Sequence, residues 1–146
     1  MAHSDLIQWS NTFSVGITII DEQHKDLIKL TNDMFNHCVG DDAAERDYFK
    51  EVIQKAVDYV KIHFSTEEKI MIKTKYPGYY EHKKQHEAFI ISILENIKSY
   101  EEGKKLTLVG FTRFLKDWIL SHIAYTDKLY IDHFRMVAAR KSQTKA

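Results

Sequence analysis

The sequence is poor in the residues that break or cross-link a chain, with one proline, five glycines and a single cysteine among 146 residues. Few prolines and glycines disfavour a turn-rich β protein and favour long helices. The lone Cys38 cannot form an internal disulfide, which excludes a disulfide-stapled secreted scaffold. No stretch reaches the roughly 18 apolar residues of a membrane span, and the N-terminus lacks the apolar core of a signal peptide. We therefore expect a cytoplasmic protein.

An excess of charge of either sign is also missing, because 21 Lys and Arg residues balance 21 Asp and Glu residues. Balanced charge gives no electrostatic footprint for nucleic acid or for an anionic membrane. A chain of this length fits one domain that buries about 68–70% of its unfolded surface. We expect a single domain over 1–146 that binds neither nucleic acid nor a membrane.

Apolar residues recur with helical period in four stretches, which predicts an all-α protein. Thr18-Ile-Ile-Asp21 matches a capping box at the start of the first helix, and Thr107 can cap the fourth. Short connections bring consecutive helices together antiparallel, so the sequence predicts an up-down-up-down four-helix bundle. The expected segments are an irregular N-terminal arm (1–17), four helices (18–39, 42–73, 78–102 and 107–125) and a short C-terminal helical tail (127–146).

Seven polar residues extend the apolar stripes of these helices: His24, His63, Glu67, His82, His86, His122 and Asp127. Two pairs, His63 with Glu67 and His82 with His86, are spaced i, i+4, so each pair projects from one helix face. In an antiparallel bundle the positions fall at the start, end, start and end of successive helices, and therefore meet at one depth. Burying them together without a metal would carry a heavy desolvation cost. Seven ligands exceed what one tetrahedral zinc needs, and mixed imidazole and carboxylate suits iron, so the sequence predicts a pair of iron ions.

Taken singly, each of these residues is a weak signal. A lone histidine on an apolar stripe is more often an ordinary core residue, and an i, i+4 His–Glu pair can lie on the surface. Asp127 raises a further difficulty, because five residues after His122 it points about 140° away on a continuous helix. It can reach the same centre only if the fourth helix ends or unwinds between Ile123 and Thr126.

These residues resemble the hemerythrin family, in particular its bacterial hemerythrin-like domains, over nearly the whole chain. The matching segments are Val15-Gly-Ile-Thr-Ile-Ile-Asp-Glu-Gln-His24, His63-Phe-Ser-Thr-Glu67, Tyr76-Pro-Gly-Tyr-Tyr-Glu-His82-Lys-Lys-Gln-His86 and Trp118-Ile-Leu-Ser-His122-Ile-Ala-Tyr-Thr-Asp127. The resemblance implies that one iron is bound by three histidines (His82, His86 and His122) and the other by two (His24 and His63). It further implies that Glu67 and Asp127 bridge both irons together with an oxo or hydroxo group. One coordination position then stays open on the two-histidine iron.

The resemblance also implies a dioxygen pocket, whose residues we expect to serve as ordinary core packing as well: Leu27, Phe64, Trp118, Ile119 and Ile123. The leading hypothesis is a non-heme di-iron protein, not an enzyme, that binds dioxygen reversibly for storage, delivery or buffering. Its open position is also suited to azide, nitric oxide or peroxide. The remaining histidines, His3, His37 and His133, match no ligand position and are expected on the surface.

Two alternatives stay open. One is an oxygen- or redox-sensing module that acts through an unknown signalling partner, with the arm or the tail responding to the centre. The other is a di-iron enzyme that consumes peroxide or nitric oxide, against which no general acid or nucleophile near the open site can be named. Iron storage is weaker still, because the ferritin-like arrangement of Glu with Glu-x-x-His is missing.

Overall fold

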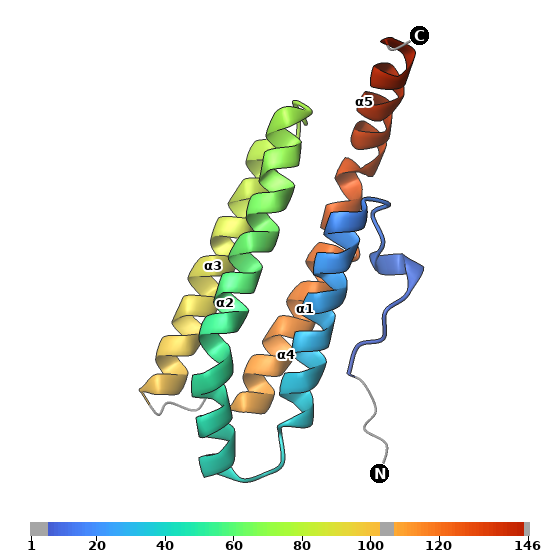
Figure 1. Ribbon diagram of the computed structural model, residues 1–146. Helices are drawn as coiled ribbons and strands as arrows, with labels where there is room; N and C mark the ends of the chain where they lie inside the picture. Colours follow the sequence, from blue (N-terminus) through green and yellow to red (C-terminus); the bar gives the residue numbers. More distant parts are fainter. Residues whose placement is uncertain (1–5, 103–106, 145–146) are drawn as a thin grey trace.

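The computed structural model describes residues 6–102 and 107–144, and in this part of the chain it contains helices and turns but no strand. Residues 1–5 of the expected arm, His3 among them, and 145–146 of the expected tail lie outside the described residues. Consecutive long helices run in opposite directions (Figure 1), so the predicted all-α, up-down-up-down bundle is confirmed. The elements in chain order are η1 (Asn11–Phe13), α1 (Thr18–Asn36), α2 (Asp42–Lys73), α3 (Tyr79–Glu101), α4 (Leu108–Trp118), η2 (Ile119–Ile123), η3 (Thr126–Tyr130) and α5 (Ile131–Thr144).

The start of α1 differs from the predicted capping box. The N-cap residue is Ile17, which makes no capping hydrogen bond through its side chain. Asp21 instead turns back to the arm, where it accepts hydrogen bonds from the Ser14 hydroxyl at 2.7 Å and the Val15 amide at 2.8 Å. The carboxylate thus fastens the arm to the first turn of α1, and this contact fixes the path of the preceding residues past the helix.

The predicted cap of the fourth helix is present, since the Thr107 hydroxyl accepts a hydrogen bond from the Gly110 amide at 3.0 Å. The first helix is shorter than the predicted 18–39, because α1 ends at Asn36. Gly40 follows with a positive φ of 80°, and its amide donates to the Glu45 carboxylate at 2.7 Å. A left-handed glycine and a carboxylate from the next helix therefore turn the chain into α2.

The buried apolar side chains form two clusters along the bundle. The larger cluster runs through all four long helices and includes Leu27, Phe64 and Ile123. The smaller one lies toward α5 and contains Val15, Ile20, Met71, Tyr130 and Phe134. Buried polar residues interrupt the apolar stripes between the two clusters: His24 lies between Ile20 and Leu27 on α1, and Glu67 lies between Phe64 and Met71 on α2.

Regular α-helix ends early in the fourth helical stretch, at Trp118 instead of at the predicted residue 125. The Ala124 amide donates to the Ile119 carbonyl at 3.3 Å, an i to i−5 bond that defines the π-helical turn η2. The chain then turns through Ala124 and Tyr125 into the 3-10 helix η3. The helix is therefore interrupted between His122 and Asp127, as the placement of Asp127 required.

The tail is helical over its described length, through η3 and then α5, which continues to Thr144. The helix α5 extends beyond the neighbouring end of α1 (Figure 1). Phe134 on α5 packs in the smaller apolar cluster. Among the described helices, none is both long enough and apolar enough to cross a membrane.

Candidate metal centre

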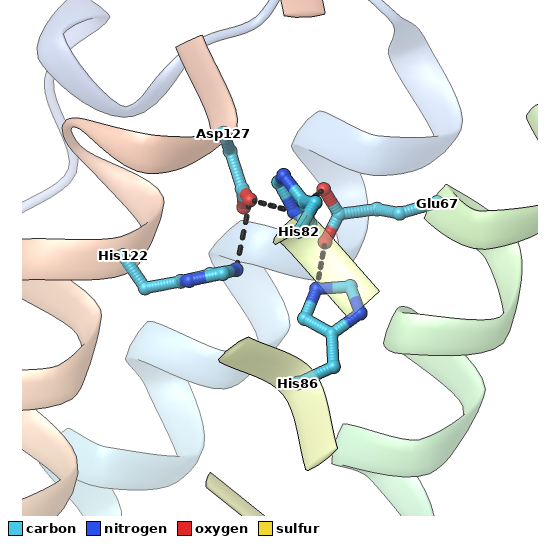
Figure 2. Close-up of side chains that lie close together, drawn as sticks. All are labelled: Glu67, His82, His86, His122 and Asp127. Atoms are coloured by element: carbon cyan, nitrogen blue, oxygen red, sulfur yellow. Dashed lines mark ion pairs between the residues drawn. The ribbon is translucent and has the colours of Figure 1, made fainter. Parts of the chain in front are cut away.

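The seven residues predicted as ligands converge inside the bundle, and none of them is more than 3% exposed. They come from α1, α2, α3, η2 and η3: His24, His63, Glu67, His82, His86, His122 and Asp127. Figure 2 shows the Glu67 and Asp127 side chains reaching from opposite sides toward the rings of three histidines. The seven side chains therefore meet at one depth of the bundle.

The nitrogen and oxygen atoms of these residues fall into two overlapping groups. Within each group one ligand atom per residue lies within 4.8 Å of all the others. Both groups contain Glu67 and Asp127; the larger adds His82, His86 and His122, and the smaller adds His24 and His63. Two adjacent metal positions that share two carboxylates would use the residues in this way.

Asp127 divides its two oxygens between the groups. Its Oδ1 lies 2.9 Å from Nε2 of His82 and 2.9 Å from Nε2 of His122. Its Oδ2 lies 3.1 Å from Nε2 of His24 and 3.9 Å from Nε2 of His63. A carboxylate that turns one oxygen to each group is placed to bridge two cations.

Glu67 is less evenly divided. Its Oε1 lies 2.7 Å from Nε2 of His63 and 3.7 Å from Nε2 of His86, and its Oε2 lies 3.6 Å from Nε2 of His82. Each of its oxygens therefore faces the larger group, while Oε1 also faces the smaller one.

The residues fit a metal because most of their inward-facing atoms are left without hydrogen-bond partners, the pair formed by Nε2 of His24 and Oδ2 of Asp127 excepted. The atoms without partners are Nε2 of His63, His82, His86 and His122, both carboxylate oxygens of Glu67, and Oδ1 of Asp127. An unpaired buried polar atom costs about 1–3 kcal/mol, so a protein rarely gathers several at one point without a use for them. Metal ions accept lone pairs from all of them at once.

Hydrogen bonds behind the rings fix which nitrogen faces inward. The Phe13 carbonyl, held beside α1 by the arm, accepts from Nδ1 of His24 at 3.1 Å. The Gln23 amide oxygen accepts from Nδ1 of His63 at 2.8 Å, while its NH2 group donates to the Thr66 hydroxyl at 3.0 Å. Since these oxygens can only accept, each Nδ1 carries a proton, and Nε2 is the nitrogen that faces the carboxylates of the centre, as in the 3.1 Å contact of His24 Nε2 with Oδ2 of Asp127.

His86 follows the same rule with a charged partner. Its Nδ1 lies 2.9 Å from a carboxylate oxygen of Glu68, the residue next to Glu67 on α2. A carboxylate accepts here as well, so Nε2 of His86 is the free lone pair.

Electrostatic interactions within the cluster are strong before any metal binds. Burial alone would lower the pKa of His63, but Glu67 and Asp127 raise that pKa to about 9. The pKa of His82 is likewise raised to about 9 by the two carboxylates against the effect of burial. For His86 burial prevails and lowers the pKa to about 3. Protons on His63 and His82 thus occupy positions where metal ions compete with them.

The predicted dioxygen pocket lies in the larger apolar cluster. Leu27, Phe64, Ile119 and Ile123 are buried, and Trp118 is half-buried against the same cluster. The Phe64 ring stacks on His86 with centroids 3.8 Å apart, and the Trp118 ring stacks on His122 at 4.7 Å. The group therefore borders the centre, while its role toward dioxygen stays a prediction.

Sequence reasoning missed Tyr130, which it placed only in the helical tail. The side chain is fully buried, its hydroxyl makes no hydrogen bond, and its ring lies 5.6 Å from that of His82. Burial and the negative charges of Glu67 and Asp127 raise the pKa of this phenol. The spacing could have revealed it, because Tyr130 follows Asp127 by one turn of 3-10 helix and so shares its face.

Two histidines outside the cluster make local contacts. His37 is exposed, as predicted, and stacks on Tyr48 with ring centroids 3.6 Å apart. His133 is half-buried at the surface: Nε2 lies 2.7 Å from the Thr74 carbonyl, which ties α5 to the end of α2.

The fold and the cluster define a helical bundle whose interior can hold two metal ions between shared carboxylates. A family model described as the hemerythrin HHE cation binding domain matches residues 15–134. The chain belongs to the hemerythrin family.

Individual relatives agree with this assignment. A bacteriohemerythrin of Stenotrophomonas maltophilia is 31% identical over 130 residues, which cover 89% of this chain and 82% of that protein. A myohemerythrin of Sipunculus nudus is 30% identical over 122 residues, or 84% and 88% of the two chains. A crystal structure of wild-type hemerythrin matches with a TM-score of 0.76 at 26% identity, covering 88% of this chain and 98% of that one.

Proposed function

We propose that this protein holds a di-iron centre and binds dioxygen reversibly, for storage, delivery or buffering. The observation that carries the proposal is the pair of overlapping ligand groups that share Glu67 and Asp127. Two positions with common carboxylates suit a dinuclear centre, and mixed imidazole and carboxylate donors suit iron. Family membership supports the same conclusion, because the matching family model describes a cation binding domain.

We assign the larger group to one iron and the smaller group to the other, with an oxo or hydroxo group completing the bridge. The three-histidine iron would be held by His82, His86 and His122, and the two-histidine iron by His24 and His63. When bound, the iron pair supplies the electrons and the vacant position that reversible dioxygen binding needs. The same position would also admit azide, nitric oxide or peroxide.

The chain fixes the orientation of the ligands and excludes water around this centre. Hydrogen bonds from Nδ1 hold three of the imidazoles in one orientation, so their Nε2 atoms are aimed before metal arrives. Leu27, Phe64 and Ile123 exclude water from the side of the centre that borders the larger cluster. Apolar side chains of this kind can neither donate nor accept a proton, which favours a carrier over an enzyme.

Reversibility is tested by reducing the iron-loaded protein anaerobically, admitting air, and removing the gas under vacuum while the visible spectrum is followed. We expect repeated cycling between a colourless and a coloured form, with two irons per chain by elemental analysis. His63→Ala should abolish cycling, whereas His37→Ala, which removes an exposed ring, should not. Zinc in place of iron, or steady turnover of added peroxide, would refute the carrier function.

A sensor is the second candidate, and one observation favours it. Asp127 lies on η3, which leads directly into α5, so a change at the bridging carboxylate is close to the tail helix. Hydrogen exchange of α5 amides should then differ between reduced and dioxygen-bound protein. Identical exchange in the two states would remove this candidate.

A further inference from the structure

Behind the centre, three histidine rings donate their outer N–H groups to acceptors that differ in charge. His86 donates to the Glu68 carboxylate at 2.9 Å. His63 donates to the neutral Gln23 amide oxygen at 2.8 Å, and His24 donates to a backbone carbonyl at 3.1 Å. The anionic acceptor serves the larger ligand group, and both neutral acceptors serve the smaller one.

The position of Glu68 on α2 places its carboxylate beside His86. It projects from α2 one residue after Glu67, about 100° round the helix, and so meets the outer edge of a ring on α3 rather than the interior of the centre. Its side chain is 23% exposed, and it lines a groove of about 630 Å³ together with His86 and Glu87. The Phe64 ring stacks on His86, which fixes the plane in which the N–H group points.

The charge of the acceptor changes what the imidazole does at its other nitrogen. A hydrogen bond to a carboxylate is roughly twice as strong as one to a neutral oxygen. It draws the Nδ1 proton outward and leaves more electron density at Nε2, which makes the ring a more basic ligand. A more basic ligand stabilises the more highly charged metal ion, so it favours ferric over ferrous iron.

We propose that Glu68 is a positioning residue that lowers the reduction potential of the three-histidine iron relative to that of the two-histidine iron. This inference rests on the proposed function, because it presupposes that the two ligand groups hold iron. If the two ligand groups hold iron, the three-histidine position would be the first to lose an electron to an outer-sphere oxidant, and the Nδ1 proton would stay between His86 and Glu68.

The test is a spectroelectrochemical titration of the iron-loaded protein at mildly alkaline pH, comparing Glu68→Gln with Glu87→Gln. Changing an outer partner of a ligand alters metal-site properties by about 10- to 100-fold. We expect E68Q to change the ferric-to-ferrous ratio at the first step by about tenfold, a positive shift of about 59 mV for one electron. E87Q removes the same charge from an exposed side chain of the same groove, and its potential should stay near that of the wild type.

The converse variant is Gln23→Glu, which places an anionic acceptor behind His63. It should lower the potential of the second step, whereas E68Q raises that of the first, so both variants bring the two steps closer together. This variant decides the matter even if E68Q binds iron poorly. Equal shifts of the reduction potential in E68Q and E87Q would show that the removed charge acts without the hydrogen bond, which would overturn the role of Glu68. Unchanged potentials in E68Q or in Q23E would overturn it as well.

A measurement without iron separates this inference from the proposed function. In zinc-loaded protein the His86 Nδ1 proton should resonate downfield, and E68Q should move it upfield. An unmoved proton overturns the inference alone. A wild-type protein that never holds two irons overturns the proposed function, while the zinc measurement still reports on the contact between Glu68 and His86.

Discussion

Removing the imidazole of His82 should uncouple the metal from the stability of the fold. This side chain is 3% exposed, and its Nε2 lies 2.9 Å from Asp127 and 3.6 Å from Glu67. Its ring packs against those of His86 and His122, with centroid distances of 4.6 Å and 5.0 Å. His82→Ala therefore deletes one of the three imidazole donors of the larger ligand group.

The size of the effect follows from linkage between binding and folding. Outer partners of metal ligands are worth about 10- to 100-fold in affinity, and a direct ligand should be worth at least the upper figure. A 100-fold loss removes about 2.7 kcal/mol of the stabilisation that saturating metal provides. For a chain of this length, each kcal/mol corresponds to roughly 2–4 °C in Tm. The gap in Tm between iron-loaded and metal-free protein should thus shrink by roughly 5–11 °C.

Calorimetric melts of both proteins, with and without iron, measure this gap and cancel the packing loss that the substitution causes in either state. Elemental analysis should show H82A falling below two irons per chain. His37→Ala is the matched control, since it deletes an exposed ring whose contacts with Tyr48 and the Asp33 carbonyl lie outside the ligand groups, and it should leave the gap intact. Wild-type protein that melts at the same temperature with and without iron would refute the coupling.

Three further outcomes are expected. Metal-free protein should be most stable near pH 6.5, the ordinary pKa of histidine. The pKa values of His63 and His82 are raised to about 9, so the stability that these residues contribute is lost as pH rises from 6.5 to 9. The pKa of His86 is lowered to about 3, so the folded protein loses stability as pH falls below 6.5 and the unfolded chain takes up a proton at this residue. Urea midpoints that stay flat across this range would contradict the assignment. Lys75→Gly should stabilise the protein by about 0.5–1 kcal/mol in urea unfolding, because Lys75 has a φ of 56°; a loss would mean that its side chain is needed. Ile123→Ala should cost about 2–5 kcal/mol and shorten the life of the coloured form as water enters; an unchanged decay rate would argue against water exclusion by this residue.

Much of the fold and the centre could be predicted because local periodicity determines them. The i, i+4 spacing of His63 with Glu67 sets both side chains on one face of α2, whatever the neighbouring helices do. A departure from helical period was also informative. Asp127 lies about 140° from His122 on a continuous helix, so its place at the centre required an interruption of the helix, which occurs at η2 and Ala124. The order of the helices and the common depth then followed from short connections.

Other features depend on packing between elements, which spacing does not encode. Glu68 meets His86 only because α2 and α3 pack at a particular rotation, so no pattern within α2 marks it as a partner. The capping box does not form at α1, because the Asp21 carboxylate accepts hydrogen bonds from Ser14 and Val15 in the arm instead of capping the helix. His133 became half-buried because α5 docks on Thr74 at the end of α2.

The centre draws residues from α1, α2 and α3 and from the turns that follow α4, and this distribution has a kinetic consequence. Helical proteins usually open by fraying, with one element detaching while the others persist. In a metal-loaded bundle α1, α2 and α3 could not detach without breaking coordinate bonds, whereas α5 carries no ligand and could still fray. Global opening then waits for ion release, so a chelator rather than denaturant strength should govern how long the loaded molecule survives.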